Sequence, residues 1–216
     1  WTYQRNRVWQ TGLSLWQDAL AKSPGQALCA NGVAAAYDKR GKPDTAIAYY
    51  EKALKIIGKK GGMPQGPLYN IGEILLRLDR PGDAVAFFKK ALAVDPDYED
   101  AHTNLGAALL RLGKLDDAMQ SSRRALEINP DLAAAYNNLG NAWFLKGDKH
   151  RAVDHFKRAL AVNPDYQEAR NNLSKVRQVI ERYGAYIDQL KSSALAQPDD
   201  PQAAWQLGRL SQAAGM

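Results

Sequence analysis

Four prolines stand at a constant interval between residues 96 and 198, and this interval constrains the fold more than any other feature. Pro96, Pro130, Pro164 and Pro198 each follow the previous one by 34 residues. A period of this length is typical of a helix-turn-helix unit that stacks in a row, so that each unit covers the apolar face of its neighbour. The interval therefore predicts an all-α repeat array.

Small side chains recur at nearly the same interval, at the places where two helices would cross. Any side chain larger than glycine or alanine there would push the helices apart. One such column is Gly72, Gly106, Gly140, Ser174 as the exception, and Gly208. Alanine columns at Ala46, Ala84, Ala118 and Ala152, and at Ala53, Ala91, Ala125 and Ala159, enclose an aromatic column of Tyr50, Phe88 and Phe156, with Ser122 as its exception. The columns predict two crossing helices in every unit.

Turn residues separate the predicted helices. Gly41, Gly113 and Gly147 fall between the two helices of a unit, where a left-handed backbone favours glycine. Asp-Pro-Asp at 95–97 and Asn-Pro-Asp at 129–131 and 163–165 lie between units, because proline cannot continue a helix and Asp or Asn favours the start of the next one.

These small, aromatic and proline columns resemble the tetratricopeptide repeat family. The resemblance is best from about Gly66 to Pro164, good from Ala27 to Leu54 and weak from Gln167 to Pro198. It implies an all-α, right-handed superhelix of paired helices. We expect a half-repeat or capping helix at 1–26, about five units at 27–200 with the last one degenerate, and a partial repeat at 201–216.

Two departures from the pattern bear on shape. The step from Ala34 to Gly72 is 38 residues, so four residues are inserted near 58–66. They predict a longer loop between units, with a functional hinge as the alternative. The final partial unit has no partner helix, which leaves Trp205 and Leu207 for another copy or domain to cover.

Composition gives little support for catalysis or cofactor binding. The charge of +6 permits anionic partners without identifying one. Cys29 is the only cysteine, the three histidines lie in separate helical settings, and no phosphate-binding glycine loop or metal-ligand spacing occurs. We therefore expect neither enzymatic activity nor a metal or cofactor. His102 is expected to be half-buried.

An asparagine row is the clearest candidate site. Asn70, Asn104, Asn138 and Asn172 recur at the 34-residue interval, and the family resemblance places first helices on the inside of the superhelix. A carboxamide donates and accepts hydrogen bonds, so such a row can bind the backbone of an extended peptide. It resembles the asparagine ladder in the repeat domain of O-linked N-acetylglucosamine transferases. The alternative, that the amides only bond a neighbouring helix or water, stays open.

Side chains beside this row would set the sequence preference of a bound peptide. The candidates are Tyr69, Glu73, Asn137, Asn141, Asn171 and Lys175. Clamps that grip the carboxylate of a chaperone tail rely on lysines, whereas the corresponding column here is Asn31, Tyr69, Thr103, Asn137 and Asn171. The sequence therefore disfavours that kind of clamp.

Basic pairs recur on the predicted second helices, at Lys89-Lys90, Arg123-Arg124 and Lys157-Arg158. The outward position of these helices and the lack of stacking aromatics disfavour specific nucleic-acid binding. A solvated surface, or weak contact with anionic lipid, is the preferred interpretation.

The amino-terminal edge is rich in aromatic and basic side chains. Trp1, Trp9 and Trp16 lie within the first 16 residues, and the segment resembles the junction of multi-pass glycosyltransferase-type membrane proteins that carry carboxy-terminal repeats of this family. No signal peptide or membrane span is evident, and the chain starts without an initiator Met. The resemblance favours an extracytoplasmic array near a membrane, with a protein or peptide ligand or, alternatively, a scaffold that self-associates through its terminal repeats.

Overall fold

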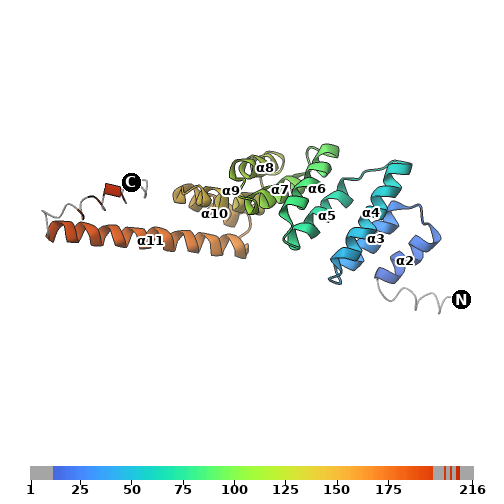
Figure 1. The fold of residues 1–216 in the computed structure, drawn as a ribbon, viewed down its shortest axis with the longest axis horizontal. Helices are drawn as coiled ribbons and strands as arrows, with labels where there is room; N and C mark the ends of the chain where they lie inside the picture. Colours follow the sequence, from blue (N-terminus) through green and yellow to red (C-terminus); the bar gives the residue numbers. More distant parts are fainter. Residues whose placement is uncertain (1–11, 197–201, 203–204, 206–207, 210–216) are drawn as a thin grey trace.

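The computed structural model describes residues 12–196 together with 202, 205, 208 and 209 (Figure 1). Within these residues all regular structure is helical. The helices are α2 Gly12–Lys22, α3 Ala27–Asp38, α4 Pro43–Lys60, α5 Gln65–Arg77, α6 Pro81–Val94, α7 Glu99–Arg111, α8 Leu115–Ile128, α9 Ala133–Leu145, α10 Lys149–Val162 and α11 Gln167–Ala196. The prediction of an all-α repeat array is confirmed.

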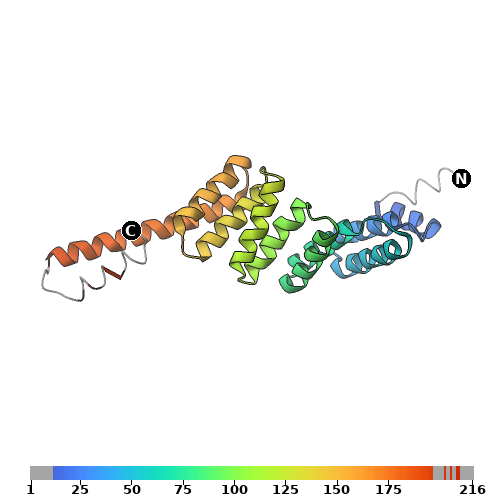
Figure 2. The ribbon, with the colours of Figure 1, turned by 90° about the horizontal axis from the view of Figure 1, so that it is seen from above.

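Eight of these helices form four pairs, α3/α4, α5/α6, α7/α8 and α9/α10, which follow one another in chain order (Figure 2). Gly41, Gly113 and Gly147 turn the chain within three pairs, with φ of 67°, 71° and 89°. Asp79, φ 55°, does the same in the pair α5/α6. Between units, Asn129 and Asn163 each accept a hydrogen bond at 3.0 Å from the backbone of the residue two positions on. The predicted turns are therefore formed.

Glycine and an aromatic ring make the crossing point in two of the pairs. A Cβ added to Gly72 would lie 2.6 Å from the Phe88 ring, and one added to Gly140 would lie 2.5 Å from the Phe156 ring. Both rings are fully buried. The glycines therefore let the first helix approach until the aromatic ring touches its backbone, which explains both columns.

The inserted residues lengthen a helix instead of a loop. Helix α4 has 18 residues, whereas α6, α8 and α10 have 14. Four residues make about one helical turn, so the extension keeps the buried face in line, and it buries Ile57. Gly61 and Gly62, with φ of 81° and 136°, then end the helix. The prediction of a longer loop was wrong because the added turn has its own apolar contact.

The unit after α10 is not a helix pair. Helix α11 is continuous over 30 residues and extends beyond the paired helices (Figure 1). Glu181 stands where the earlier units have Gly113 and Gly147, and a non-glycine side chain disfavours the left-handed backbone of that turn. The chain therefore continues as a helix that buries Leu173, Val176, Ile187 and Leu190.

Helix α2 packs against α3 at the amino-terminal end of the described array. Leu13 and Leu20 are buried, and the Trp16 ring packs against Gly32 so closely that a Cβ there would lie 2.2 Å from it. Trp1, Trp9 and Leu207 lie outside the described residues. None of the helices in the described part is both long and apolar enough to cross a membrane.

Candidate peptide-binding face

The first helices of the units lie close to one another along the array. Helix α5 contacts α7, α7 contacts α9 and α9 contacts α11, whereas no two second helices are among the packed pairs of the described part. We call the exposed side of α3, α5, α7, α9 and the start of α11 the first-helix face. It is the more closely spaced side of the stack.

The asparagine row lies along this face, and its amides point toward the preceding unit. Nδ2 of Asn104 donates to the Tyr69 hydroxyl at 2.9 Å, and Nδ2 of Asn138 donates to the Thr103 carbonyl at 2.9 Å. Nδ2 of Asn172 donates to Oδ1 of Asn137 at 3.0 Å. Each acceptor belongs to the residue 35 positions earlier in the chain. The common direction of these bonds joins successive first helices.

Burial divides the row into two groups. Asn138 of the row is 7% exposed and its neighbour Asn137, outside the row, is 1% exposed, so neither presents much surface to a ligand. Asn70, Asn104 and Asn172 are half-buried, and Asn70 lies beside Tyr50 of the preceding unit. The amide donors of Asn104, Asn138 and Asn172 are thus engaged between units, as the structural alternative requires. The half-buried amides of Asn70, Asn104 and Asn172 still reach the surface.

Asn138 is the row member whose side chain should contribute most to the stability of the array, because it is buried. Asn138→Ala is expected to lower the free energy of unfolding by about 1–3 kcal/mol, because it removes a buried hydrogen bond between α9 and α7. Asn141→Ala, at a half-buried position one helical turn further on, should cost less than about 0.5 kcal/mol. Urea titration followed by circular dichroism measures both. Equal effects would remove the inter-unit role of Asn138.

Tyr69, Glu73 and Asn104, three of the predicted residues, come together with Tyr98 and Asp100; we call these five the Tyr69 cluster. The rings of Tyr69 and Tyr98 are 5.0 Å apart between centroids. Nδ2 of Asn104 lies 3.4 Å from Oε1 of Glu73. Neither carboxylate, Glu73 or Asp100, forms an ion pair in the described part of the chain. The cluster is therefore an anionic site with two aromatic rings.

Titration shifts reflect this crowding. Burial, with the nearby carboxylates of Glu73 and Asp100, raises the pKa of Tyr69 well above its usual range. Burial and the same carboxylates raise the pKa of Tyr98 to about 12. Burial, with Glu99 beside it, also raises the pKa of the Asp100 carboxyl. Every shift opposes further negative charge, which a bound cation would relieve.

A second cluster with related side chains forms where α9 meets α11. Glu168 accepts from Nδ2 of Asn137 at 3.1 Å and from the Tyr166 hydroxyl at 3.2 Å. Burial, followed by the Glu168 charge, raises the pKa of Tyr166 to about 12. Asn171 accepts from Gln167 at 2.8 Å, and Lys175 is exposed. Glu168 thus joins Asn137 of α9 to Tyr166, which directly precedes α11.

Tyr98, Asp100, Tyr166 and Glu168 were missed from the sequence. A signal was present, because Tyr98 and Tyr166 each follow a column proline, Pro96 or Pro164, by two residues. They stand two units apart and each precedes an acidic residue in the first turn of a first helix.

The basic side chains at the carboxy-terminal ends of α5 and α7 already have partners within the array. Arg77 pairs with Asp38 of the preceding unit. Arg111 donates to the Leu76 carbonyl at 2.7 Å and lies 3.6 Å from Asp79. These contacts join units and leave the charge of the Tyr69 cluster uncompensated.

The histidines do not gather into a reactive site. His102 and His155 are half-buried and His150 is exposed, so the expectation for His102 is confirmed. Within the part of the chain that is described, no three His, Cys, Asp or Glu side chains are placed to hold a metal ion.

Solved structures of helical-repeat proteins share this architecture. YrrB, described as a TPR protein with an unusual peptide-binding site, aligns with a TM-score of 0.61 at 24% identity, over 74% of this chain and 80% of its own. The Cut9-Hcn1 hetero-tetramer of the APC/C aligns at 0.68 and 18% identity, over 92% and 38%. The first TPR of Spaghetti (RPAP3), bound to an HSP90 peptide, aligns at 0.51 and 26% identity, over 54% and 93%.

The helix-pair fold and the polar first-helix face place this chain in the class of helical-repeat modules for protein–protein interaction. Repeat proteins of this class are generally not enzymes. The chain belongs to the tetratricopeptide repeat family: models of this repeat match residues 26–59, 75–142 and 133–166, which together make up more than half of it. No curated protein matches the chain.

Proposed function

We propose that the first-helix face binds an extended segment of a partner protein, and that a lysine or arginine of this segment enters the Tyr69 cluster. The observation that carries the proposal is the pair of carboxylates, Glu73 and Asp100, beside two tyrosine rings and without an ion pair in the described residues. A cation over a tyrosine ring gains from the ring quadrupole as well as from the carboxylates.

The half-buried amides support an extended ligand. Asn70, Asn104 and Asn172 lie along the direction in which the units stack, and hydrogen bonds to the preceding unit fix the orientation of Asn104 and Asn172. A fixed carboxamide oxygen can accept from the backbone N–H groups of a peptide without selecting its side chains. The amides would thus contribute affinity, and the Tyr69 cluster would contribute specificity.

This charge preference differs from that of the RPAP3 repeat, which is bound to the HSP90 peptide SRMEEVD. That peptide is rich in glutamate. In this chain the column that would hold clamp lysines contains Asn31, Tyr69, Thr103, Asn137 and Asn171. A basic or neutral segment is therefore the better match.

A peptide array tests the proposal. Ten-residue peptides with one or two lysines are expected to bind at micromolar affinity, and matched peptides with glutamate at the same places about tenfold more weakly. The lysine peptides should lose affinity between about 50 and 300 mM salt, because exposed charges are screened. No preference between the two sets would refute the cationic ligand.

A second candidate, self-association through the carboxy-terminal end, is favoured by one exposed aromatic. Trp205 is 60% exposed, with Arg209 stacked 4.8 Å from its ring centroid. If copies stack there, light scattering of a dilution series should show dimers that Trp205→Ala weakens by about tenfold. A protein that stays monomeric at all concentrations would exclude self-association and would leave peptide binding as the remaining candidate function.

A further inference from the structure

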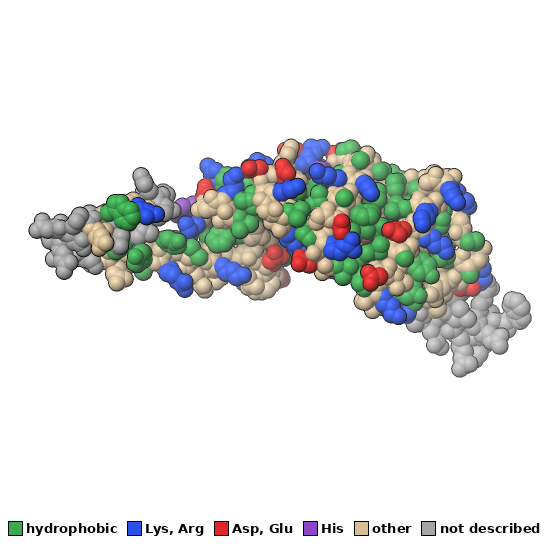
Figure 3. Space-filling model, in the orientation of Figure 1, with side chains coloured by type: hydrophobic (Ala, Val, Ile, Leu, Met, Phe, Trp, Pro, Cys, Tyr) green, Lys and Arg blue, Asp and Glu red, His purple; other side chains and the backbone are tan. Residues whose placement is uncertain are grey.

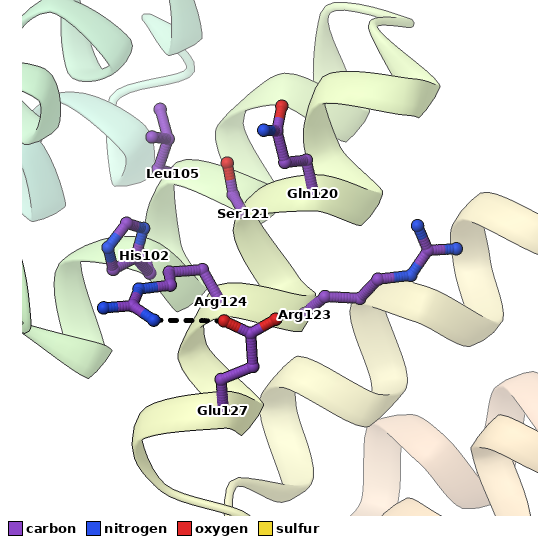
Figure 4. Close-up of a pocket in the computed structure, with 7 residues that line it drawn as sticks. All are labelled: His102, Leu105, Gln120, Ser121, Arg123, Arg124 and Glu127. Atoms are coloured by element: carbon purple, nitrogen blue, oxygen red, sulfur yellow. Dashed lines mark hydrogen bonds and ion pairs between the residues drawn. The ribbon is translucent and has the colours of Figure 1, made fainter.

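One unit of the array lacks the aromatic residues that its neighbours have on the second helix. Ser121 in α8 stands where the flanking units have Phe87 and His155, and Ser122 stands where they have Phe88 and Phe156. A cavity of about 330 Å³ lies beside Ser121. Its walls come from His102 and Leu105 of α7 and from Gln120, Ser121, Arg123, Arg124 and Glu127 of α8 (Figure 4).

The neighbouring units show what belongs in such a place. In the following unit the His155 ring stacks on Tyr136 of the first helix, with 6.4 Å between centroids. In the preceding unit Phe87 packs with Leu68 of the first helix. His102 takes the place of Tyr136 and Leu68 in the unit with the cavity, so its partner ring is the group that is missing. A ring from another molecule would restore this packing.

Hydrogen-bond acceptors at the cavity favour an aromatic side chain that carries a hydrogen-bond donor. Nε2 of His102 donates to the Pro96 carbonyl at 2.9 Å, which leaves Nδ1 of the neutral imidazole as an acceptor. That Nδ1 atom is buried and has no hydrogen-bond partner. The Ser121 hydroxyl donates to the Asp117 carbonyl at 3.0 Å, so its oxygen is also free to accept. A tyrosine O–H or a tryptophan N–H would satisfy one of these acceptors.

Charges around the cavity indicate the sign of the partner. Arg124 is engaged by Asp97 at 2.6 Å and by Glu127 at 3.1 Å. The remaining members of the basic pairs are exposed and form no ion pair among the described residues: Lys89, Lys90, Arg123, Lys157 and Arg158. Basic side chains are visible over α8 in Figure 3. A negatively charged segment matches this surface.

We propose that the cavity on α8 is a second binding site, which takes the tyrosine or tryptophan side chain of an acidic segment of a partner protein. The site lies between α7 and the second helix α8, outside the first-helix face, and does not depend on the function proposed for that face. The chain would then bind two protein segments of opposite charge on different faces.

Fluorescence anisotropy with a labelled acidic peptide, four glutamates around one tyrosine, tests this site. The peptide with alanine in place of tyrosine is expected to bind at least about tenfold more weakly, because the ring and its donor are lost. Ser121→Phe fills the cavity from within, as Phe87 does in the preceding unit, and should abolish the difference between the peptides. Circular dichroism checks that this variant keeps the wild-type helix content.

Two further variants separate this site from its alternatives. Arg123→Glu should weaken both peptides about tenfold through charge alone. Asp44→Asn with Glu51→Gln, at exposed positions of α4, should leave both affinities unchanged. Equal binding of the tyrosine and alanine peptides, or full binding by Ser121→Phe, would overturn the proposal. Anionic vesicles that bind wild type and Ser121→Phe alike, in the absence of any tyrosine preference, would assign the surface to lipid instead.

Discussion

Phe156→Ala is expected to destabilise the array by about 3–5 kcal/mol, because it empties a junction of three helices. The ring is fully buried and packs with Leu173 and Val176 of α11. It also touches the backbone of Gly140, so α9, α10 and α11 all meet at this side chain. Removing it leaves a cavity that these helices would have to close. Urea denaturation followed by circular dichroism measures the loss.

The same column provides a matched control. Ser122 in α8 is also fully buried, but Ser122→Ala removes only a hydroxyl that donates to the Ala118 carbonyl of its own helix. It should change the stability by less than about 1 kcal/mol. Because repeat arrays can unfold in parts, the transition of Phe156→Ala should begin at the α9–α11 end. A cost below about 1 kcal/mol for Phe156→Ala would show that this crossing does not hold the units together.

Glu73→Gln combined with Asp100→Asn is expected to weaken the binding of a lysine-containing peptide about 30-fold. Each carboxylate, half-exposed and screened by water, should contribute about 1 kcal/mol to holding the cation, and about 2 kcal/mol corresponds to this factor. Because burial raises the pKa of Asp100, binding should also begin to weaken at a higher pH than for an ordinary aspartate as acid is added. Isothermal titration calorimetry at low salt measures both effects.

Two acidic residues on a second helix serve as the control for charge. Asp44→Asn with Glu51→Gln removes the same charge from exposed positions of α4. This variant should bind the peptide within about twofold of wild type, since long-range charge effects are screened beyond about 10 Å. Equal losses in the two double variants would mean that net charge, and no defined site, attracts the peptide.

The repeat columns were readable from the sequence because each is fixed by contacts inside one unit. Gly72 with Phe88 and Gly140 with Phe156 are such contacts, and the structure forms both. The asparagine row was found from its 34-residue interval, and the family resemblance placed it on the first helices. Its hydrogen bonds were not predictable, because Asn138 reaches Thr103 only through the stagger between two units, which no local pattern records.

Helix α4 and helix α11 show a second limit. A longer loop was expected where α4 continues and buries Ile57. A degenerate unit was expected where α11 continues through Glu181, which replaces the glycine of the earlier turns. Tyr98 and Asp100 were missed since each looks like an ordinary residue beside a helix start. Only the packing of the Tyr69 ring against the Tyr98 ring shows that they belong to one cluster.

A partner segment on the first-helix face would lie over amides already oriented by the preceding unit. Two-dimensional NMR of the asparagine side-chain amides, during titration with a lysine-containing peptide, tests this placement most directly. The signals of Asn70, Asn104 and Asn172 are predicted to shift, while those of Asn129 and Asn163, in the turns between units, stay in place. Shifts confined to Asn129 and Asn163, or no shift at Asn104 when the peptide is bound, would contradict it.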